Sequence, residues 1–263
     1  MGVLSNILSV KNSSDDKYKI WTVLGIKIKF SRKDWMIAQT YRLALENKET
    51  LSKIQKRLFM LDVPLNYKKY WTDDNMQNVI PLGYGDFPEG FHPGELIRDI
   101  LKDIPYNKIL DFGCAYGRLS RAFDPEKYIG IDLNPNALKK ARENNPDYTY
   151  IEIDVNSEYP GCDVAFAHTV FLHNDDETLL SILKRLKKAG CKYIVVSDVM
   201  SKDFHNGFIP PTYHRSLDDY NKLMSEAGFS FVSETKRIYK RYKEDERYKD
   251  KNSDLSFLLY KSV

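Results

Sequence analysis

The stretch "KILDFGCAYGRLSRAF", residues 108–123, decides the fold of this 263-residue chain. A short apolar run ends on an acid and a glycine, and a basic, helix-like run follows. A glycine-rich turn between a strand and a helix usually holds a phosphate on its backbone N–H groups. Here Asp111 occupies the first position of the G-x-G-x-x-G frame of dinucleotide sites, and the Gly-Lys-Ser/Thr of phosphate-binding loops is missing. The turn is therefore expected to bind a different kind of ligand.

The acid in this turn favours a positively charged ligand. The carboxylate of Asp111 would repel a pyrophosphate, whereas S-adenosylmethionine carries an ammonium and a sulfonium group. Gly113 and Gly117 would let the backbone approach the methionine and ribose parts of that molecule closely. The turn therefore points to S-adenosylmethionine.

Acids also end the next two strand-like runs. Asp132 lies 21 residues after Asp111, and in open α/β sheets an acid at that place accepts hydrogen bonds from ribose hydroxyls. Asp154 ends the third run and is followed by Val155, so the two are expected beside the adenine amine and ring. Three acids at the ends of three successive strands predict S-adenosyl-L-methionine as the cofactor and S-adenosyl-L-homocysteine as its product. A nicotinamide-binding or signalling α/β fold is the alternative.

From about Pro93 the chain alternates strands and helices. Five strand-like runs separated by helical patterns predict a parallel, doubly wound sheet, and two final runs joined without a helix predict an antiparallel hairpin at one edge. The predicted fold is α/β, with a Rossmann-like seven-stranded sheet in a core domain over residues 93–263. The strands are expected over 108–113, 128–132, 148–154, 162–169, 192–199, 229–240 and 253–262, and the helices over 94–104, 116–123, 134–144, 175–190 and 216–229.

Residues 1–92 do not follow this pattern and are predicted to form a hairpin and a mostly helical cap. "KYKIWTVLGIKIKF" (17–30) alternates apolar and polar residues around Gly25, which predicts two paired strands. Apolar residues recur at helical spacing over 31–61, and Ser31 can cap that helix. The hairpin could pair with a second chain, so a homodimer is one expected arrangement.

Composition and charge exclude several classes of partner. Lys and Arg total 40 against 37 Asp and Glu, a net charge of +3, which gives no argument for nucleic-acid binding. No apolar run is long enough to span a bilayer, and the first ten residues lack the basic region of a signal peptide, so no stable membrane insertion is expected. Cys114, Cys162 and Cys191 are expected as buried free thiols, which indicates a reducing, cytoplasmic location.

The segment from about Glu95 to Val263 resembles class I S-adenosylmethionine-dependent methyltransferases. The motifs that carry the resemblance are "LDFGCAYGR" (110–118), "GIDLNPNAL" (130–138) and "IEIDV" (151–155). The resemblance implies an enzyme that transfers a methyl group from S-adenosylmethionine. It also implies a set of cofactor-binding residues: Asp111, Gly113, Cys114, Gly117, Arg118, Asp132, Leu133, Asp154, Val155 and Ala167.

The run "FAHTVFLHNDDE" (166–177), at the end of the fourth predicted strand, suggests the kind of acceptor. Base-directed amino methyltransferases share an Asn/Asp-Pro-Pro-aromatic motif here, which this chain lacks, so methylation of nucleic-acid bases is disfavoured. The "VFLH" that ends on His173 resembles a signature of small-molecule methyltransferases, including sugar O-methyltransferases. In some of those, the histidine pairs with an acid at the end of the fifth strand, here Asp198, to deprotonate a hydroxyl.

Other roles stay open for these groups. His173 could instead cap the following helix or touch the cofactor, and Asp198 could only bond a turn. His168, nearer the strand end, is a rival base, and His92 is open between a helix cap and a contact with a lid. No pair of histidines has the H-x-x-x-H or H-x-x-E-H spacing of a helical metal site, so no metal is predicted.

Residues in two further segments are expected to meet the acceptor. In the loop after the fifth strand, Tyr213, His214 and Arg215 could grip a phosphate or a sugar hydroxyl, or they could only flank a helix. Tyr84 and Trp71, in aromatic clusters of the cap, could close the mouth of the site or pack between cap and core.

A second, short likeness concerns the substrate. "TVLGIKIKFSRK" (22–33) is similar to a segment found at the ends of bacterial surface-polysaccharide enzymes. It suggests O-methylation of a capsular polysaccharide precursor, on a sugar or a phosphoramidate group. Methylation of another small metabolite and a cofactor-binding but inactive partner subunit are the alternatives.

Overall fold

The computed structural model describes the backbone and side chains of residues 71–72, 87, 89–154, 157–200, 212–240, 243–244 and 254–263. For residues 8–12, 18–23, 26–31, 207–208, 211 and 241–242 it describes the backbone. The chain forms two compact units, residues 1–65 and 66–263. The predicted division between residues 92 and 93 stays a prediction.

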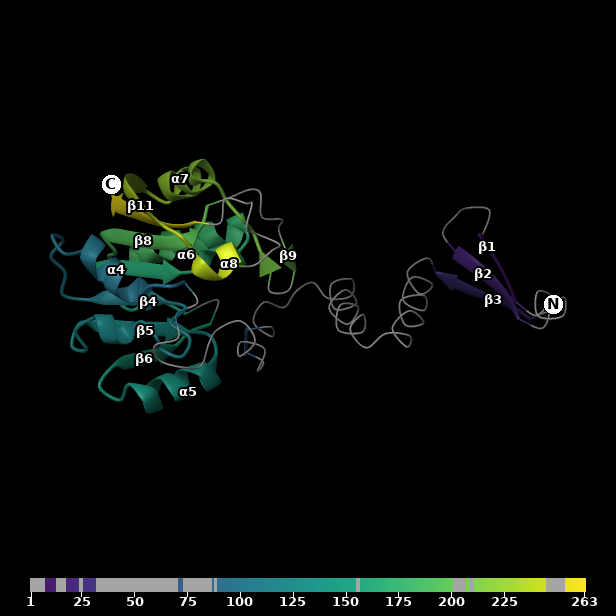
Figure 1. The fold of residues 1–263 in the computed structure, drawn as a ribbon, viewed down its shortest axis with the longest axis horizontal. Helices are drawn as coiled ribbons and strands as arrows, with labels where there is room; N and C mark the ends of the chain where they lie inside the picture. Colours follow the sequence, from purple (N-terminus) through teal and green to yellow (C-terminus); the bar gives the residue numbers. More distant parts are fainter. Residues whose placement is uncertain are drawn as a thin grey trace. The chain divides into compact units, whose positions relative to one another are not determined.

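The first unit contains a three-stranded sheet in the order β1-β2-β3 (Figure 1). β2 (Tyr18–Val23) pairs antiparallel with β3 (Ile26–Ser31), so the predicted hairpin is confirmed. β1 (Leu8–Asn12) pairs with the other side of β2, which the sequence pattern did not predict. Beyond Ser31, the predicted helix over 31–61 lies outside the described residues.

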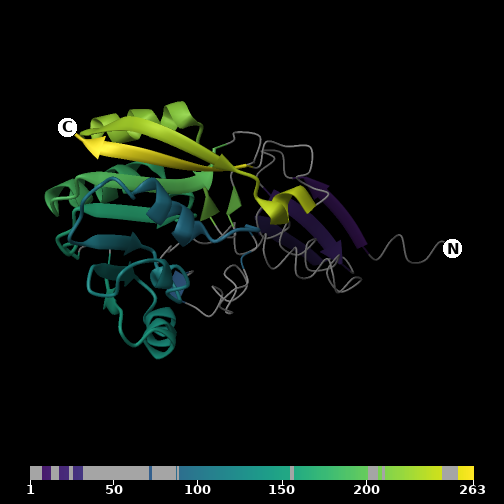
Figure 2. The same ribbon diagram turned by 60° about the vertical axis from the view of Figure 1, so that its left-hand side comes forward.

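The second unit is built on a seven-stranded sheet in the order β11-β12-β8-β7-β4-β5-β6 (Figure 1). β4 to β8 pair in parallel, and β12 is antiparallel to both β8 and β11. The predicted five parallel strands with a terminal antiparallel hairpin are therefore confirmed, and Figure 2 shows that hairpin along one side of the sheet. The strands are β4 (Ile109–Phe112), β5 (Tyr128–Asp132), β6 (Thr149–Glu152), β7 (Val164–His168), β8 (Tyr193–Val199), β11 (Phe229–Arg237) and β12 (Leu255–Ser262).

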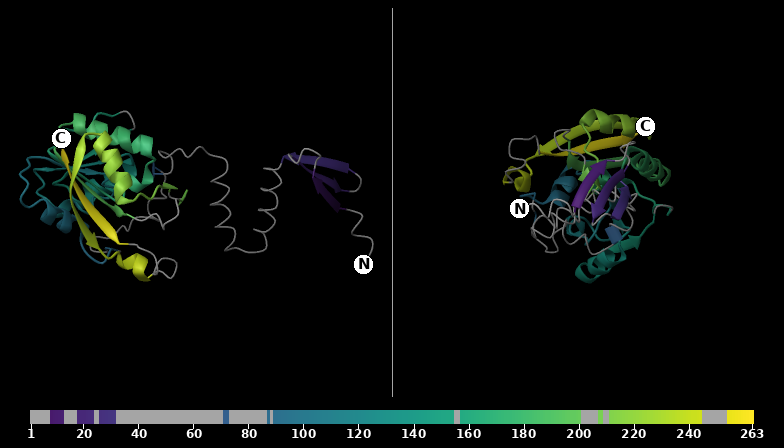
Figure 3. Two further views of the ribbon diagram at one scale, coloured as in Figure 1. Left: turned by 90° about the horizontal axis from the view of Figure 1, so that it is seen from above. Right: turned by 90° about the vertical axis from the view of Figure 1, so that its right-hand side faces the viewer.

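Helices cover both faces of this sheet (Figure 3). α6 (Asp176–Lys188) and α7 (Leu217–Glu226) pack on one face, in one apolar core. α4 (Pro93–Ile100) and α5 (Pro135–Asn144) pack on the other face, in a second core. β4 and β7 are buried along their whole length because both of their faces meet helices, which is why they read as continuous apolar runs.

Capping residues fix where the helices begin. Asn134, Asp175 and Ser216 cap α5, α6 and α7, each by accepting a hydrogen bond from a backbone N–H of the first turn. His92 caps α4, since its Nδ1 accepts from the Glu95 amide at 3.2 Å, and this is the first of the two roles left open for it. α5 and α6 therefore begin in the loops after β5 and β7, at the edge of the sheet where the predicted site lies.

The helix predicted over 116–123 is wrong. Residues 115–119 form turns, and only a three-residue 3-10 helix, η3 (Ser120–Ala122), follows them. Gly117 stands at φ +68, a left-handed conformation through which a right-handed helix cannot continue. Phe123 is extended, at φ −123 and ψ 158, and ends the segment.

Candidate functional site

The glycine-rich turn that follows β4 has an unusual backbone. Gly113 and Gly117 stand at φ +78 and +68, and Ala115 between them stands at φ +48. A Cβ added to Gly113 would lie 2.6 Å from Cγ2 of Val170, and one added to Gly117 would overlap the hydroxyl of Tyr150. The turn therefore needs both glycines, for their conformation and for the space that their missing side chains leave.

Replacing Gly113 by alanine should lower the free energy of unfolding by about 1–3 kcal/mol, because a strained backbone is combined with a clash against Val170. Chemical denaturation measures the loss. Gly161→Ala is the control, because its Cβ would meet nothing closer than the Ala189 carbonyl at 3.7 Å. The free energy of unfolding of this control should stay within about 0.5 kcal/mol of that of the parent. A Gly113→Ala protein as stable as this control would contradict the strained turn.

Asp132, the last residue of β5, faces the turn. Its Oδ2 accepts from the Ala115 amide and its Oδ1 from the Asn134 amide, both at 2.9 Å. Each carboxylate oxygen has two lone-pair sites, so the carboxylate still has room for a further hydrogen bond beside those from the backbone. Asp132 is 8% exposed, and burial raises the pKa of its carboxyl group. This arrangement fits the predicted acceptor of ribose hydroxyls.

Asp111, on β4, is almost fully buried. Its Oδ2 accepts from the Tyr128 hydroxyl at 2.6 Å. Burial raises the pKa of Asp111 to about 7, the Tyr128 hydrogen bond opposes this rise, the neighbouring Asp132 adds to it, and Arg118 opposes it. A cation bound at the turn would favour the charged form of Asp111. Asp111 therefore fits a group that acts on a cationic ligand through its charge more than through direct contact.

The other predicted cofactor residues differ in exposure. Cys114 is buried in the core beside β5. Ala167 is fully buried, so its side chain lies in the core rather than at the turn. Leu133 is half-buried and Asp154 is exposed, each just after a strand end. Val155 lies outside the described residues.

Trp71 and His173 lie together beside the turn. Their ring centroids are 4.7 Å apart and the rings are tilted by 60°. The side chain of Trp71 packs against Ala115 and Tyr116 of the turn, and its carbonyl oxygen accepts from Asn134 Nδ2 at 2.5 Å. Trp71 therefore connects the glycine-rich turn with His173, which fits its predicted place at the mouth of the site.

His168 belongs to a buried polar network. Its Nε2 lies 3.0 Å from Glu89 Oε1, and its Nδ1 lies 2.9 Å from Ser197 Oγ. A glutamate carboxylate only accepts, so Nε2 carries the proton and Nδ1 accepts from the Ser197 hydroxyl. Burial lowers the pKa of His168, although Glu89 opposes this. Because both ring nitrogens are occupied inside the protein, the structure does not support His168 as a rival base.

Arg118 is part of the same network. Its Nη2 donates to Glu89 Oε1 at 2.7 Å, and its guanidinium also lies 5.5 Å from the Phe87 ring centroid. Burial would raise the pKa of Glu89, but its hydrogen bonds with His168 and Arg118 and the charge of Arg118 hold that pKa well below its usual range. The charged end of Arg118 therefore binds Glu89. Of Arg118, only the backbone remains for the predicted contact with the cofactor.

Asp198 pairs with Tyr220 and not with His173. The Tyr220 hydroxyl donates to Asp198 Oδ2 at 2.5 Å, whereas Oδ1 has no hydrogen-bond partner among the described residues. Asp198 is fully buried, and burial raises its pKa to about 7 against the opposing effects of Tyr220 and Arg215. The structure therefore does not form the predicted pair of His173 with Asp198.

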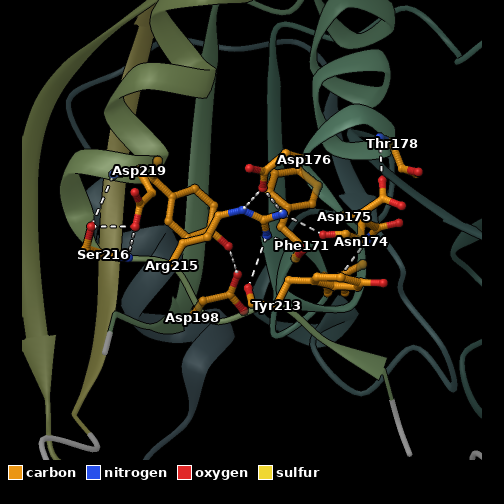
Figure 4. Close-up of polar contacts among 12 residues, drawn as sticks. Phe171, Asn174, Asp175, Asp176, Thr178, Asp198, Tyr213, Arg215, Ser216 and Asp219 are labelled. Atoms are coloured by element: carbon orange, nitrogen blue, oxygen red, sulfur yellow. Dashed lines mark hydrogen bonds and ion pairs between the residues drawn. The ribbon is translucent and has the colours of Figure 1, made fainter. Parts of the chain in front are cut away.

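Arg215 is buried, and its guanidinium is bonded inside the protein to Asp176 and to backbone carbonyls (Figure 4). The structure therefore does not support the prediction that it grips a phosphate or a sugar hydroxyl. Tyr213 and His214 are half-buried beside it, and burial lowers the pKa of His214. Tyr84 lies outside the described residues.

Several residues of the site were not predicted. Glu89, Tyr128 and Tyr220 each bond a predicted residue from a distant element, so no local spacing could have found them. Asn134 is different, because an asparagine before the proline of "NPNAL" is a pattern typical of a helix start. In the part of the chain that the structure describes, no three metal-ligating side chains come together.

Comparison with known proteins shows what the middle part of the chain is similar to. Residues 109–190 match a family model described as a methyltransferase domain. A stretch of 98 residues is 39% identical to a trans-aconitate 2-methyltransferase of Afipia carboxidovorans, over 34% of this chain and 38% of that protein. A stretch of 119 residues is 28% identical to a trans-aconitate 2-methyltransferase of Rhodopseudomonas palustris (strain BisB18), over 41% of this chain and 46% of that protein. The chain thus spans less than half the length of these relatives.

Solved structures share the fold. A SAM-dependent methyltransferase of Leishmania major superposes with a TM-score of 0.58 at 16% identity, over 74% of this chain and 81% of that one. The magnesium protoporphyrin IX methyltransferase of Synechocystis PCC 6803, with bound SAH, superposes with a TM-score of 0.56 at 13% identity, over 74% of this chain and 98% of that one. None of these proteins is named as a surface-polysaccharide enzyme, so they do not support that predicted likeness. Residues 109–190, in the second unit of the chain, are similar to methyltransferase domains, in line with the predicted resemblance.

Proposed function

We propose that the chain is an S-adenosylmethionine-dependent methyltransferase whose cofactor lies at the carboxyl ends of β4, β5 and β6. The observation that carries the proposal is that the methyltransferase-domain match over 109–190 includes the strained turn and Asp132. The turn offers its backbone to the methionine part, and Asp132 offers acceptor oxygens to the ribose. When bound, the cofactor would supply the methyl group as an electrophile.

The acceptor in this proposal is a small molecule with a hydroxyl group. The protein's own part is to hold the acceptor and to take its proton. His173 supports this role because it lies beside the turn, next to Trp71. A neutral imidazole can accept a proton from a hydroxyl near pH 7 as the oxygen attacks. The sugar or phosphoramidate group of a capsular polysaccharide precursor belongs to this class of acceptor.

A polycarboxylate is the second candidate, because the matched relatives are named trans-aconitate 2-methyltransferases. Such an acceptor is best held by cations, above all by the forked guanidinium of arginine. Arg118 is paired with Glu89, and Arg215 with Asp176. Among the side chains that the structure describes, neither of these two guanidinium groups is therefore available to an acceptor.

An acceptor panel with methyl-labelled S-adenosylmethionine tests the proposal. The panel holds nucleotide-activated sugars, nucleotide-linked phosphoramidate, capsular polysaccharide lacking its methyl groups, trans-aconitate and RNA, and mass spectrometry follows the label. Label on a sugar or phosphoramidate supports the proposal, and label on trans-aconitate selects the carboxylate class instead. If calorimetry shows that the cofactor binds and nothing is labelled, the inactive partner subunit gains support. Absence of cofactor binding overturns the proposal.

His173→Asn should lower kcat by about a hundredfold or more, because asparagine cannot accept the proton. The dissociation constant of the cofactor should stay within about twofold, since the turn and Asp132 are unchanged. His92→Asn is the matched control, because asparagine can replace the histidine as the cap of α4. Turnover of the His173→Asn protein at the rate of this control would exclude His173 as the base.

We propose that the protein is cytoplasmic, because its three cysteines are free thiols. Cys114, Cys162 and Cys191 are buried and free, as expected in a reducing compartment. Separately, none of the described helices is both long and apolar enough to cross a membrane. The homodimer and the absence of nucleic-acid binding stay predictions.

A further inference from the structure

Arg215 joins the loops that follow β7 and β8 (Figure 4). Its side chain is 3% exposed. Nε and Nη2 donate to Asp176 Oδ1 at 2.8 and 2.6 Å, and Nη2 also donates to the Asn174 carbonyl at 2.7 Å. Nη1 donates to the carbonyls of Phe171 and Tyr213 at 3.1 and 3.3 Å. One guanidinium therefore holds the start of α6, the loop before it, and the loop after β8.

Two of these carbonyls lie on either side of His173 in the chain. The 3-10 helix η4 (Phe171–His173) is a single turn, and the carbonyls of such a turn have few partners of their own. Arg215 supplies donors to the carbonyls of Phe171 and Asn174. The backbone that carries His173 is therefore fixed both before and after that residue.

The third carbonyl belongs to the segment 212–216, which we call the acceptor loop. The Tyr213 amide donates to the Leu172 carbonyl at 2.6 Å, while its own carbonyl accepts from Arg215. Tyr213 is thus bonded at both its amide and its carbonyl. These bonds fix the distance between the acceptor loop and the turn that carries His173.

Only arginine can make this set of bonds. The five donations use all five N–H groups of the guanidinium, which lie in one plane and point outward as a fork. Lysine carries three N–H groups on one atom and cannot reach the same acceptors together. Tyr220 adds to the fit, since the guanidinium carbon lies 5.6 Å from its ring centroid.

We infer that Arg215 is a positioning residue, which sets the imidazole of His173 against the acceptor loop. The kinetic consequence rests on the proposed function, whereas the fixed geometry of the two loops does not. Arg215 itself touches neither cofactor nor acceptor, because all of its donors are used within the protein.

The full-length Arg215→Lys protein tests this inference in two ways. Hydrogen exchange measured by NMR should be about tenfold or more faster at the amides of His173 and Tyr213, while the amides of β7 keep their parental rates. With the acceptor found in the panel, kcat should fall about tenfold or more, and the dissociation constant of the cofactor should stay within about twofold.

A milder pair of variants keeps the test valid if Arg215→Lys fails to fold. Asp176→Ala removes one acceptor of the guanidinium at a side chain that is 74% exposed. It should speed exchange at His173 and Tyr213 by a smaller factor, about threefold. Glu177→Ala, one residue further along α6 and also exposed, is the matched control and should change neither amide.

The outcomes separate this inference from the proposed function. Parental exchange at His173 and Tyr213 in Arg215→Lys, or in Asp176→Ala if the first variant does not fold, overturns the inference. Faster exchange at these amides with parental kcat also overturns it, because the loops would then be held without consequence for the reaction. If the parent protein labels no acceptor, the proposed function fails while the exchange data still decide whether Arg215 fixes the loops.

Discussion

A Glu89→Ala protein should have a free energy of unfolding about 3–5 kcal/mol lower than that of the parent. Glu89 is 1% exposed, and its carboxylate binds Arg118 Nη2 at 2.7 Å and His168 Nε2 at 3.0 Å. Alanine leaves the Arg118 guanidinium, whose side chain is 13% exposed, without its counter-charge, and leaves the His168 N–H without an acceptor. The loss is large because both groups stay out of water. Urea denaturation followed by circular dichroism measures it.

Glu158→Ala is the matched control for this prediction. Glu158 binds Lys188 at the same 2.7 Å, but the two side chains are 84% and 77% exposed. Its loss should leave the free energy of unfolding close to that of the parent, because water and salt screen an exposed ion pair. Replacing Glu89 and Arg118 together by methionine should recover part of the stability lost in Glu89→Ala, since an apolar pair leaves no unpaired charge. Equal losses for Glu89→Ala and Glu158→Ala would contradict a stabilising buried network.

The stability that Asp111 and Asp198 contribute should fall as the pH rises from about 4 to about 7. Burial raises the pKa of each carboxyl group from 3.8 to about 7. Between these values the folded protein keeps both protons, whereas the unfolded chain releases them. Each group's contribution is therefore complete below the unfolded pKa and is lost as the pH passes the folded one. The slope is about 1.4 kcal/mol per pH unit and the total on the order of 4 kcal/mol for each group.

Asparagine variants isolate this effect from groups that act in the opposite direction. Burial lowers the pKa of His168, so His168 reduces stability as the pH falls below its ordinary value of 6.5. Asp198→Asn keeps an acceptor for the Tyr220 hydroxyl but cannot titrate. Relative to the cofactor-free parent, Asp198→Asn and Asp111→Asn should each become more stable between pH 4 and 8. Asp103 is exposed, and Asp103→Asn is the control. The difference between its free energy of unfolding and that of the parent should stay constant over this pH range. If the free energy of unfolding of Asp198→Asn also kept a constant difference from that of the parent, Asp198 would not be a buried, protonated carboxyl group in the folded protein.

The sheet could be predicted because its pattern is local. β4 and β7 are buried on both faces and are therefore apolar throughout, and the segments between strands carry helical spacing and caps. The helix over 116–123 could not be excluded in this way. Its residues have ordinary helical preferences, and only the folded turn places Ala115 and Gly117 in the left-handed region.

The site could be predicted where a strand end alone fixes a residue, as it does for Asp132. The hydrogen bonds of the site could not be predicted, because they join residues that are far apart in the sequence. Glu89 and His168 are 79 residues apart in the chain, and Asp198 and Tyr220 are 22 apart, so packing and not spacing brings each pair together. Arg215 is the clearest example of what the sequence could not predict, because an arginine in a loop is expected to be exposed, whereas Arg215 is buried. Its acceptors come together only when the loops after β7 and β8 meet.

The contact between Trp71 and His173 has an optical consequence. The chain has three tryptophans, Trp21, Trp35 and Trp71, and only Trp71 belongs to the second unit. Its indole lies 4.7 Å from the imidazole of His173, centroid to centroid. A protonated imidazole at contact distance quenches indole emission strongly, and a neutral one does so weakly. With phenylalanine at positions 21 and 35, the remaining fluorescence would therefore follow the protonation of His173 directly, without a label or a substrate.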